Sequence, residues 1–184
     1  MQLREWFRRD LDELENMLGQ VFPVDGSHLG EFIIPAKRIF VVGQGRTGLV
    51  MKMFAMRLMQ IGIPTHIVGE TLTPAIYPGD LLIAASGSGE TPSVVRAAQR
   101  AKEIGAQVAI ITSQVNSGLA KLADHLTIIP GESIKLSSQV NTKLPLANAL
   151  EQTTLIFLDC VVAWLAAQNG QTNEIMMTRH ANLE

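Results

Sequence analysis

The sequence predicts an α/β protein: a three-layer, doubly wound fold of flavodoxin type around a five-stranded parallel sheet, with an N-terminal helix and a C-terminal helical tail. Strand-like apolar runs alternate along the chain with segments of helical periodicity, an order typical of strand–helix–strand units. The runs LLIAAS and QVAIIT are almost entirely apolar, as expected for parallel strands that are covered on both faces.

A chain of 184 residues and 20.0 kDa fits one domain. We divide it into an N-terminal helix and connecting loop (1–34), an α/β core (35–168) and a C-terminal tail (169–184). Within the first part, apolar residues recur at helical spacing between charges, which predicts an amphipathic helix over 2–19. These residues are Leu3, Trp6, Phe7, Leu11, Leu14 and Leu18. The glycines and the proline of 19–32 predict the connecting loop.

The core elements follow from the apolar runs and from the glycines and caps that interrupt them. The expected strands are 38–43, 65–68, 81–85, 107–112 and 125–129. The expected helices are 47–61, 92–104, 117–123 and a long one over 145–168. In the tail, Thr172 is a suitable cap for a short helix. Ile175 and Met176 need cover there, so the tail should dock on its own domain or on a neighbouring subunit.

Composition argues against several classes of function. The formal net charge is −2, and no lysine- or arginine-rich run is present, which disfavours a nucleic-acid partner. The single cysteine, Cys160, and four scattered histidines give no internal disulfide and no zinc spacing. The mixed charges at the start do not resemble an export signal, and the run TTLIFLDCVVAWLAAQ falls short of a membrane span. We therefore expect a cytoplasmic protein without a metal site.

The segment GQGRTG, residues 43–48, directly follows the first expected strand. Gly43, Gly45 and Gly48 allow close backbone approach, and Thr47 offers a hydroxyl at the start of a helix, where amide groups favour an anion. The same spacing occurs in dinucleotide-binding proteins, in which an acidic residue about 20 positions later binds ribose. Glu70 fits that requirement, so both interpretations stay open here.

A second loop, SGSGETPS at residues 86–93, follows the third expected strand. It brings the hydroxyls of Ser86, Ser88 and Thr91 together around Gly87, just before a helix that begins at Pro92. Such a loop can bind one phosphate group through its hydroxyls and the free amides of the helix. The alternative is a turn that makes only its own local hydrogen bonds.

The segments GQGRTG, GETLTPAIYPGDLLIAASGSGET, AKEIGAQVAIIT, LAKLADHLTIIPG and RHANLE resemble the sugar isomerase (SIS) family, and within it the hexulose-phosphate isomerases. The resemblance runs from about residue 38 to the end. Two departures are Thr47, where a serine is expected, and PLANALEQ, where a glycine-containing turn is expected. The resemblance implies a sugar-phosphate isomerase that interconverts 3-hexulose 6-phosphate and fructose 6-phosphate without a cofactor or metal. It also implies a homotetramer that works with a hexulose-6-phosphate synthase in formaldehyde fixation.

Such an isomerisation moves a proton between adjacent carbons through an enediol, which needs a base and stabilisation of the enediolate oxygen. Glu151 lies on the same helical stripe as Leu155 and Leu158, which suits a desolvated base, although a solvated residue at the helix entry is the alternative. The resemblance implies that Glu151 is the base.

Arg46 would lie beside the phosphate or the enediolate, unless it is an ordinary exposed loop arginine. The resemblance implies that His180, in the tail, handles ring oxygens and hydroxyl protons and often does so in a neighbouring subunit. The expected phosphate-binding residues are Ser86, Ser88, Thr91, Thr47, Gly45 and Gly87. We read the other histidines as structural.

Three other functions compete with this one. They are a heptose-phosphate isomerase, which can use zinc; a SIS module that senses a sugar phosphate for a partner; and a dinucleotide-binding protein.

Overall fold

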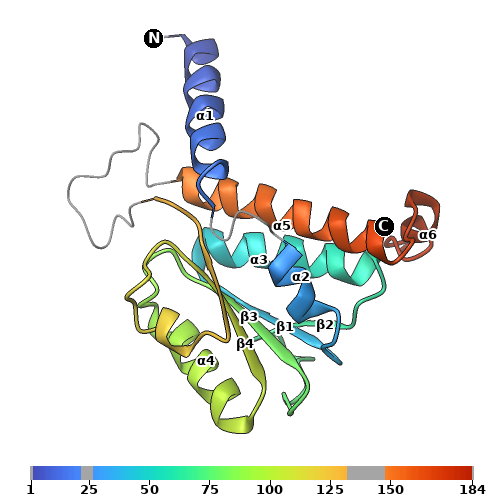
Figure 1. Cartoon of the computed structure of the whole chain (residues 1–184). Helices are drawn as coiled ribbons and strands as arrows, with labels where there is room; N and C mark the ends of the chain where they lie inside the picture. The colour runs from blue at the N-terminus through green and yellow to red at the C-terminus, as the bar shows by residue number, and fades with distance from the viewer. Residues whose placement is uncertain (1, 22–26, 132–147, 184) are drawn as a thin grey trace.

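The computed structural model describes residues 2–21, 27–131 and 148–183. Its centre is a parallel five-stranded sheet with the strand order β2-β1-β3-β4-β5 (Figure 1). The strands are β1 (Ile39–Val42), β2 (Thr65–Ile67), β3 (Leu81–Ala85), β4 (Gln107–Thr112) and β5 (His125–Ile128). Each lies within a residue or two of the expected strand, so the predicted α/β class is confirmed.

Helices cover both faces of the sheet, as Figure 1 shows, with α2, α3 and α5 on one side and α4 on the other. Their bounds are α1 (Leu3–Leu18), α2 (Ser27–Ile33), α3 (Gly45–Gln60), α4 (Pro92–Ile104), α5 (Asn148–Gln168) and α6 (Asn173–Met177). A short 3₁₀ helix, η1 (Ala120–Leu122), precedes β5. The predicted three-layer arrangement therefore holds.

Alternate residues along each strand divide the core between the two faces, because successive strand side chains point to opposite sides. Residues such as Ile39, Val41 and Ile83 are fully buried with α3 and α5. The intervening Phe40, Leu82 and Ile110 pack with α4 instead. Burial on both faces explains why these strands read as continuous apolar runs.

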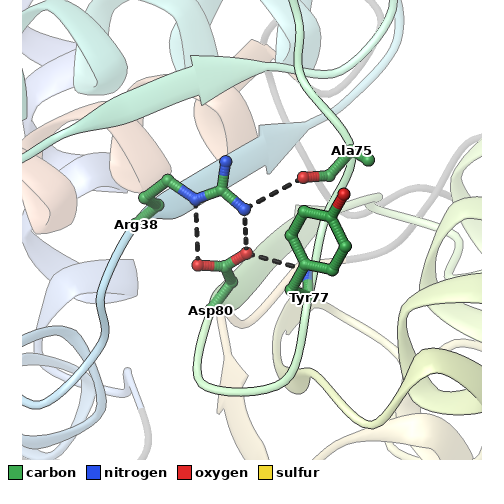
Figure 2. Close-up of polar contacts among 4 residues, drawn as sticks. All are labelled: Arg38, Ala75, Tyr77 and Asp80. Carbon is green, nitrogen blue, oxygen red and sulfur yellow. Dashed lines mark hydrogen bonds and ion pairs between the residues drawn. The ribbon is translucent and has the colours of Figure 1, made fainter.

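The connection from β2 to β3, residues 68–80, crosses β1 without a helix of its own. Arg38, directly before β1, fixes this connection (Figure 2). Its guanidinium donates to both carboxylate oxygens of Asp80, at 3.1 and 2.6 Å, and to the Ala75 carbonyl at 2.9 Å. Asp80 also accepts the N–H of Tyr77 at 2.8 Å. The guanidinium lies over the Phe40 and Tyr77 rings, so one arginine holds the connection against the sheet.

The expected connecting loop over 19–32 is partly wrong, because α2 forms in it. Leu29 and Ile33 lie one helical turn apart and are each 1% exposed. Gly30 lies so close to Trp164 of α5 that a Cβ atom would stand 2.3 Å from the ring. The apolar spacing of this segment indicated a helix, but the prediction gave more weight to its glycines and its proline.

Two further differences concern helices. The helix expected over 117–123 is only η1: the hydroxyl of Ser117 accepts the N–H of Ala120 at 3.2 Å, and the chain returns to an extended form at Ala123. The long helix was expected from 145, and residues 145–147 lie outside the described part. By length and composition, α5 is long enough to cross a membrane, although its apolar run was expected to fall short of a span. Half of its apolar window is buried in the domain.

The first and last helices are only partly covered. The α1 helix projects from the body near the start of α5 (Figure 1), and it buries Leu14 while Leu3, Phe7 and Leu11 are largely exposed. The short α6 is capped as predicted, since Thr172 Oγ1 accepts the N–H of Ile175 at 3.3 Å. Apolar surface on both helices therefore remains open to another molecule.

Candidate functional site

The two glycine loops predicted to bind phosphate lie next to each other. They follow β1 and β3, which are adjacent and in register, with Val42 opposite Ala84. Ligands in open parallel sheets bind outside the carboxyl ends of such strands. The expected position of the site is therefore matched by the fold.

In the first loop, two glycines allow the chain to turn tightly into α3. A Cβ atom on Gly48 would lie 2.8 Å from the Gly43 carbonyl oxygen, so the two residues need to be small. Gly45 has a φ of +59°, which favours glycine, and has open space beside its Cα. The loop therefore exposes backbone at the first turn of α3, where helix amides attract an anion.

The second loop is closed by hydrogen bonds among its own residues. The hydroxyls of Ser86 and Thr91 lie 2.8 Å apart, and Ser86 Oγ also accepts the N–H of Gly89 at 3.2 Å. Ser88 Oγ accepts the N–H of Glu90 at 3.3 Å. These bonds are the local ones that the alternative interpretation expected, and they also hold the three hydroxyls in place.

Two features of this loop go beyond a simple turn. Thr91 takes the cap position of α4 through its backbone, so its hydroxyl is not used as a cap. Among the described residues, the backbone N–H groups of Gly87 and Ser88 have no hydrogen-bond acceptor. Free amides beside hydroxyls at a helix start suit a phosphate group.

A small pocket joins the two loops to the start of α5. Thr47 of the first loop, Ser86 and Gly87 of the second, and Leu150 and Thr154 of α5 all line it. A Cβ atom on Gly87 would lie 2.6 Å from Leu150 Cδ2, so a glycine lets α5 approach the loop. The first turn of α5 is thereby brought to the expected phosphate site.

Glu151 and Arg46 form an ion pair next in sequence to two residues that line this pocket, Leu150 and Thr47. Arg46 Nε donates to Glu151 Oε2 at 2.5 Å, across 105 positions of sequence. The Glu151 side chain is only 17% exposed, whereas that of Arg46 is 62% exposed. A sheltered carboxylate thus has an exposed cationic partner. Glu151 also lies in the first turn of α5, as the helix-entry interpretation expected.

His180 lies far from this group in its own chain. The tail docks at the far end of α3, where Arg179 Nη1 donates to the Gln60 carbonyl at 3.1 Å. Helix α3 spans the distance from Arg46 to Gln60, which is about 21 Å at 1.5 Å per residue. The structure thus brings together Arg46, Thr47, Ser86, Gly87, Thr91 and Glu151, but not His180.

Other acidic residues near the carboxyl edge have structural partners. Glu70 pairs with Lys52 at 2.5 Å, and both side chains are about half exposed. They line a separate hollow beside β1 and β2, together with Gln44 of the first loop. Glu90 accepts the N–H of Gly118 at 2.6 Å, which ties the serine loop to the segment before η1. That tie was not predicted from the sequence.

The remaining core histidines behave as structural residues. His66 packs on Phe40, with ring centroids 5.1 Å apart. His125 is buried against Phe32 and its ring lies 3.0 Å from the Thr127 hydroxyl, and burial lowers the pKa of this imidazole. Within the described ranges, no group of three His, Cys, Asp or Glu residues is placed to hold a metal ion.

Comparison with known proteins finds one matching domain family and relatives that share one name. The SIS domain family matches residues 32–155. The chain is 40% identical to a 3-hexulose-6-phosphate isomerase of Bacillus subtilis (strain 168) over the full length of both. It is also 40% identical to a 3-hexulose-6-phosphate isomerase of Mycobacterium gastri, over 94% of this chain and 87% of that one.

A solved structure is also similar to this chain over nearly its whole length. A hypothetical protein of Methanococcus jannaschii, whose structure was described as inferring 3-hexulose-6-phosphate isomerase function, superimposes with a TM-score of 0.83 and 34% identity. The match covers 98% of this chain and 99% of that one.

Proposed function

The chain belongs to the SIS domain family, and on that premise we propose that it is a 3-hexulose-6-phosphate isomerase. The enzyme interconverts 3-hexulose 6-phosphate and fructose 6-phosphate. Full-length relatives at 40% identity carry this activity in their names. The geometric observation that supports it is the ion pair of Arg46 and Glu151, whose chain neighbours Thr47 and Leu150 line the pocket beside the serine loop.

In this proposal the substrate's phosphate binds between the two loops. The hydroxyls of Ser86, Ser88, Thr91 and Thr47 donate to its oxygens, and the amides beside Gly45 and Gly87 add further donors. The loop's internal hydrogen bonds hold these hydroxyls in place before the ligand arrives, which lowers the cost of ordering them.

The proton transfer then takes place at the edge of the pocket. Glu151 removes the proton from carbon 2 of the open-chain 3-hexulose, and the electrons of that C–H bond form the enediolate between carbons 2 and 3. The charge that builds on the carbon 3 oxygen is stabilised by Arg46, whose exposed side chain is free to turn from Glu151 to the ligand. The hydroxyl proton of oxygen 2 passes to the charged oxygen 3, which it neutralises. Return of the carbon-bound proton from Glu151 to carbon 3 then leaves the ketone at carbon 2 and a hydroxyl at carbon 3.

We propose that the site is completed by a second copy of the chain in a homotetramer. About 21 Å of α3 separates Arg46, which pairs with Glu151, from Gln60, where Arg179 docks next to His180, so a catalytic His180 would serve a neighbour. Exposed apolar residues on three helices offer contact surfaces for that neighbour, namely Leu3, Phe7, Leu11, Met53, Met56, Met59 and Met177.

We further propose that the enzyme acts in the cytoplasm, after a hexulose-6-phosphate synthase that supplies its substrate in formaldehyde fixation. The one cysteine of the chain agrees with a reducing compartment.

The decisive experiment is a coupled assay. Purified protein is mixed with formaldehyde, ribulose 5-phosphate and a hexulose-6-phosphate synthase, and fructose 6-phosphate is measured over time. Formation of fructose 6-phosphate that depends on this protein and disappears in Glu151→Gln supports the proposal. No formation above the synthase alone would reject it.

The competing functions have their own readouts. Metal analysis of the active protein, and an assay with a heptose 7-phosphate, test the heptose-phosphate alternative. Thermal unfolding with NAD and with fructose 6-phosphate tests the dinucleotide alternative, because a ligand raises the midpoint only of a protein that binds it.

A further inference from the structure

We propose that Arg179 is a positioning residue for His180. It fixes the C-terminal segment to the end of α3, and so it holds His180 away from the Glu151 site of its own chain and available to a second subunit. The inference rests on the function proposed above, from which His180 takes its role.

The contacts of Arg179 connect three separate segments. Its Nη1 donates to the Gln60 carbonyl at 3.1 Å and to Gln171 Oε1 at 3.0 Å. Gln60 is the last residue of α3, and Gln171 lies in the turn between α5 and α6. A cation at a helix C-terminus also interacts favourably with the helix dipole and satisfies a terminal carbonyl. One guanidinium thereby joins the ends of two helices to the tail.

Gly62 provides the surface on which this guanidinium rests. It follows α3 with a φ of +86°, and a Cβ atom there would lie 3.1 Å from Arg179 Nη2 and 3.2 Å from Cζ. The positive φ ends the helix, and the missing side chain leaves room for a planar group. The glycine thus serves both the helix end and the docking of the tail.

The rest of the tail is held only lightly. Met176 packs against the core, whereas Ile175 and Met177 are 38% and 65% exposed. His180 is exposed as well, and within the described part of the chain its ring forms a hydrogen bond with the neighbouring Ala181 carbonyl alone. Arg179 therefore makes the side-chain hydrogen bonds that attach the segment next to His180 to the domain. Their loss should release His180 without unfolding the domain.

The contact itself can be tested without any enzyme assay. Hydrogen–deuterium exchange over 173–180 is compared in the parent, Arg179→Met and Arg57→Met. Arg57 is the matched control, because it is a cation at the same helix end that bonds the Gln60 side chain instead of the tail. We expect exchange in the tail to rise about tenfold in Arg179→Met, as for the loss of one or two hydrogen bonds, and to stay unchanged in Arg57→Met. Equal exchange in Arg179→Met and the parent would overturn the proposal.

The link to His180 is tested by kinetics. Arg179→Met should lower kcat about 10- to 100-fold, as for a displaced catalytic group, with KM within about threefold, since the proposed phosphate-binding groups are unchanged. Arg179→Lys should recover part of kcat, because an ammonium can donate to the same acceptors but lacks the planar group that packs on Gly62. Gln171→Met removes only one of the two acceptors of Arg179, so it should lower kcat a few-fold. It replaces Arg179→Met in the test if that variant does not fold.

The double variant Arg179→Met/His180→Ala decides how the two residues are related. If Arg179 acts through His180, the double variant is no slower than His180→Ala alone. A further loss in the double variant, or a normal kcat in Arg179→Met beside an impaired His180→Ala, would overturn the proposal. A fully active His180→Ala would overturn it together with the role of His180, while the coupled assay of the parent would still judge the isomerase function separately.

Discussion

Arg46 and Glu151 form an ion pair at 2.5 Å between the first turns of two neighbouring helices, α3 and α5, that are 105 positions apart in the sequence. The pair joins a sheltered carboxylate to an exposed guanidinium, and the chain neighbours Thr47 and Leu150 line the pocket beside the serine loop. Each half of the pair has a separate role in the proposed reaction, so each can be removed separately.

Glu151→Gln keeps the shape of the side chain and removes the base. We expect kcat to fall by about 10² to 10⁴, the usual contribution of positioned proton transfer, with KM within a few-fold of the parent. Steady-state kinetics of fructose 6-phosphate formation measure both. Glu70→Gln is the matched control, because Glu70 also pairs with a cation at the carboxyl edge. Near-normal kcat in Glu151→Gln would reject Glu151 as the base and direct attention to Glu70 or Glu90.

Removing the hydroxyls of Ser86 and Ser88 together should weaken binding of the sugar phosphate. Each hydroxyl that donates to a charged acceptor is worth about 1.5 to 3 kcal/mol, so KM should rise at least about tenfold for each. Thr65→Ala is the control: its hydroxyl bonds a backbone carbonyl at 3.0 Å, at the opposite edge of the sheet. Calorimetric titration with fructose 6-phosphate checks the result. Unchanged affinity in a folded double variant would show that this loop does not bind the phosphate.

Much of the fold could be predicted from the sequence, because strands buried on both faces are short apolar runs between glycines. All five strands were placed within a residue or two for this reason. The helix α2 was missed because Gly26 and Gly30 were interpreted as loop residues. The helical spacing of Leu29 and Ile33 was therefore given no weight. In the structure, Gly30 is needed for contact with Trp164.

The site was harder to predict than the fold. The two loops could be placed together because parallel strands end at one edge. The Arg46–Glu151 pair could not be predicted, because it depends on which end of α5 packs beside the start of α3. For the same reason the distance from His180 to Glu151 was not visible in the sequence, and Arg179 carried no signal that distinguished it from any other tail arginine.

The Arg38–Asp80 pair should make the stability of the domain depend on pH. Burial of Asp80 disfavours its charge, but the hydrogen bonds from Arg38 and from the Tyr77 N–H outweigh this and lower its pKa below the usual 3.8. A carboxyl whose pKa is lower in the folded state stabilises the fold above its unfolded pKa, and this contribution is lost as the pH falls through the folded value. The loss should therefore appear below about pH 3.8.

Asp80→Asn tests this directly. The carboxylate side chain is only 2% exposed and its partner 26% exposed, so breaking the pair should cost about 3 kcal/mol at pH 7, the lower end for a buried pair. Urea unfolding at pH 7, 5 and 3 measures the difference, which should shrink at pH 3. Asp159→Asn, on the exposed side of α5, should change stability little at any pH. A difference that does not vary with pH would contradict the assignment.

The last prediction concerns the subunit that His180 serves. If the tail of one chain completes the site of its neighbour, a mixture of His180→Ala and Glu151→Gln chains, each nearly inactive alone, should regain activity once subunits exchange. A hybrid assembly holds sites in which Glu151 comes from one chain and His180 from the other, and random mixing leaves both intact in about a quarter of the sites. His28→Ala mixed with Glu151→Gln is the control for simple dilution, because His28 is an exposed histidine that lies 3.7 Å from Glu31. Native mass spectrometry of differently tagged chains verifies the exchange. No recovery in verified hybrids would mean that His180 does not act across the interface. Because its own tail docks at the end of α3 opposite to the Arg46–Glu151 pair, it would then have no place in the reaction.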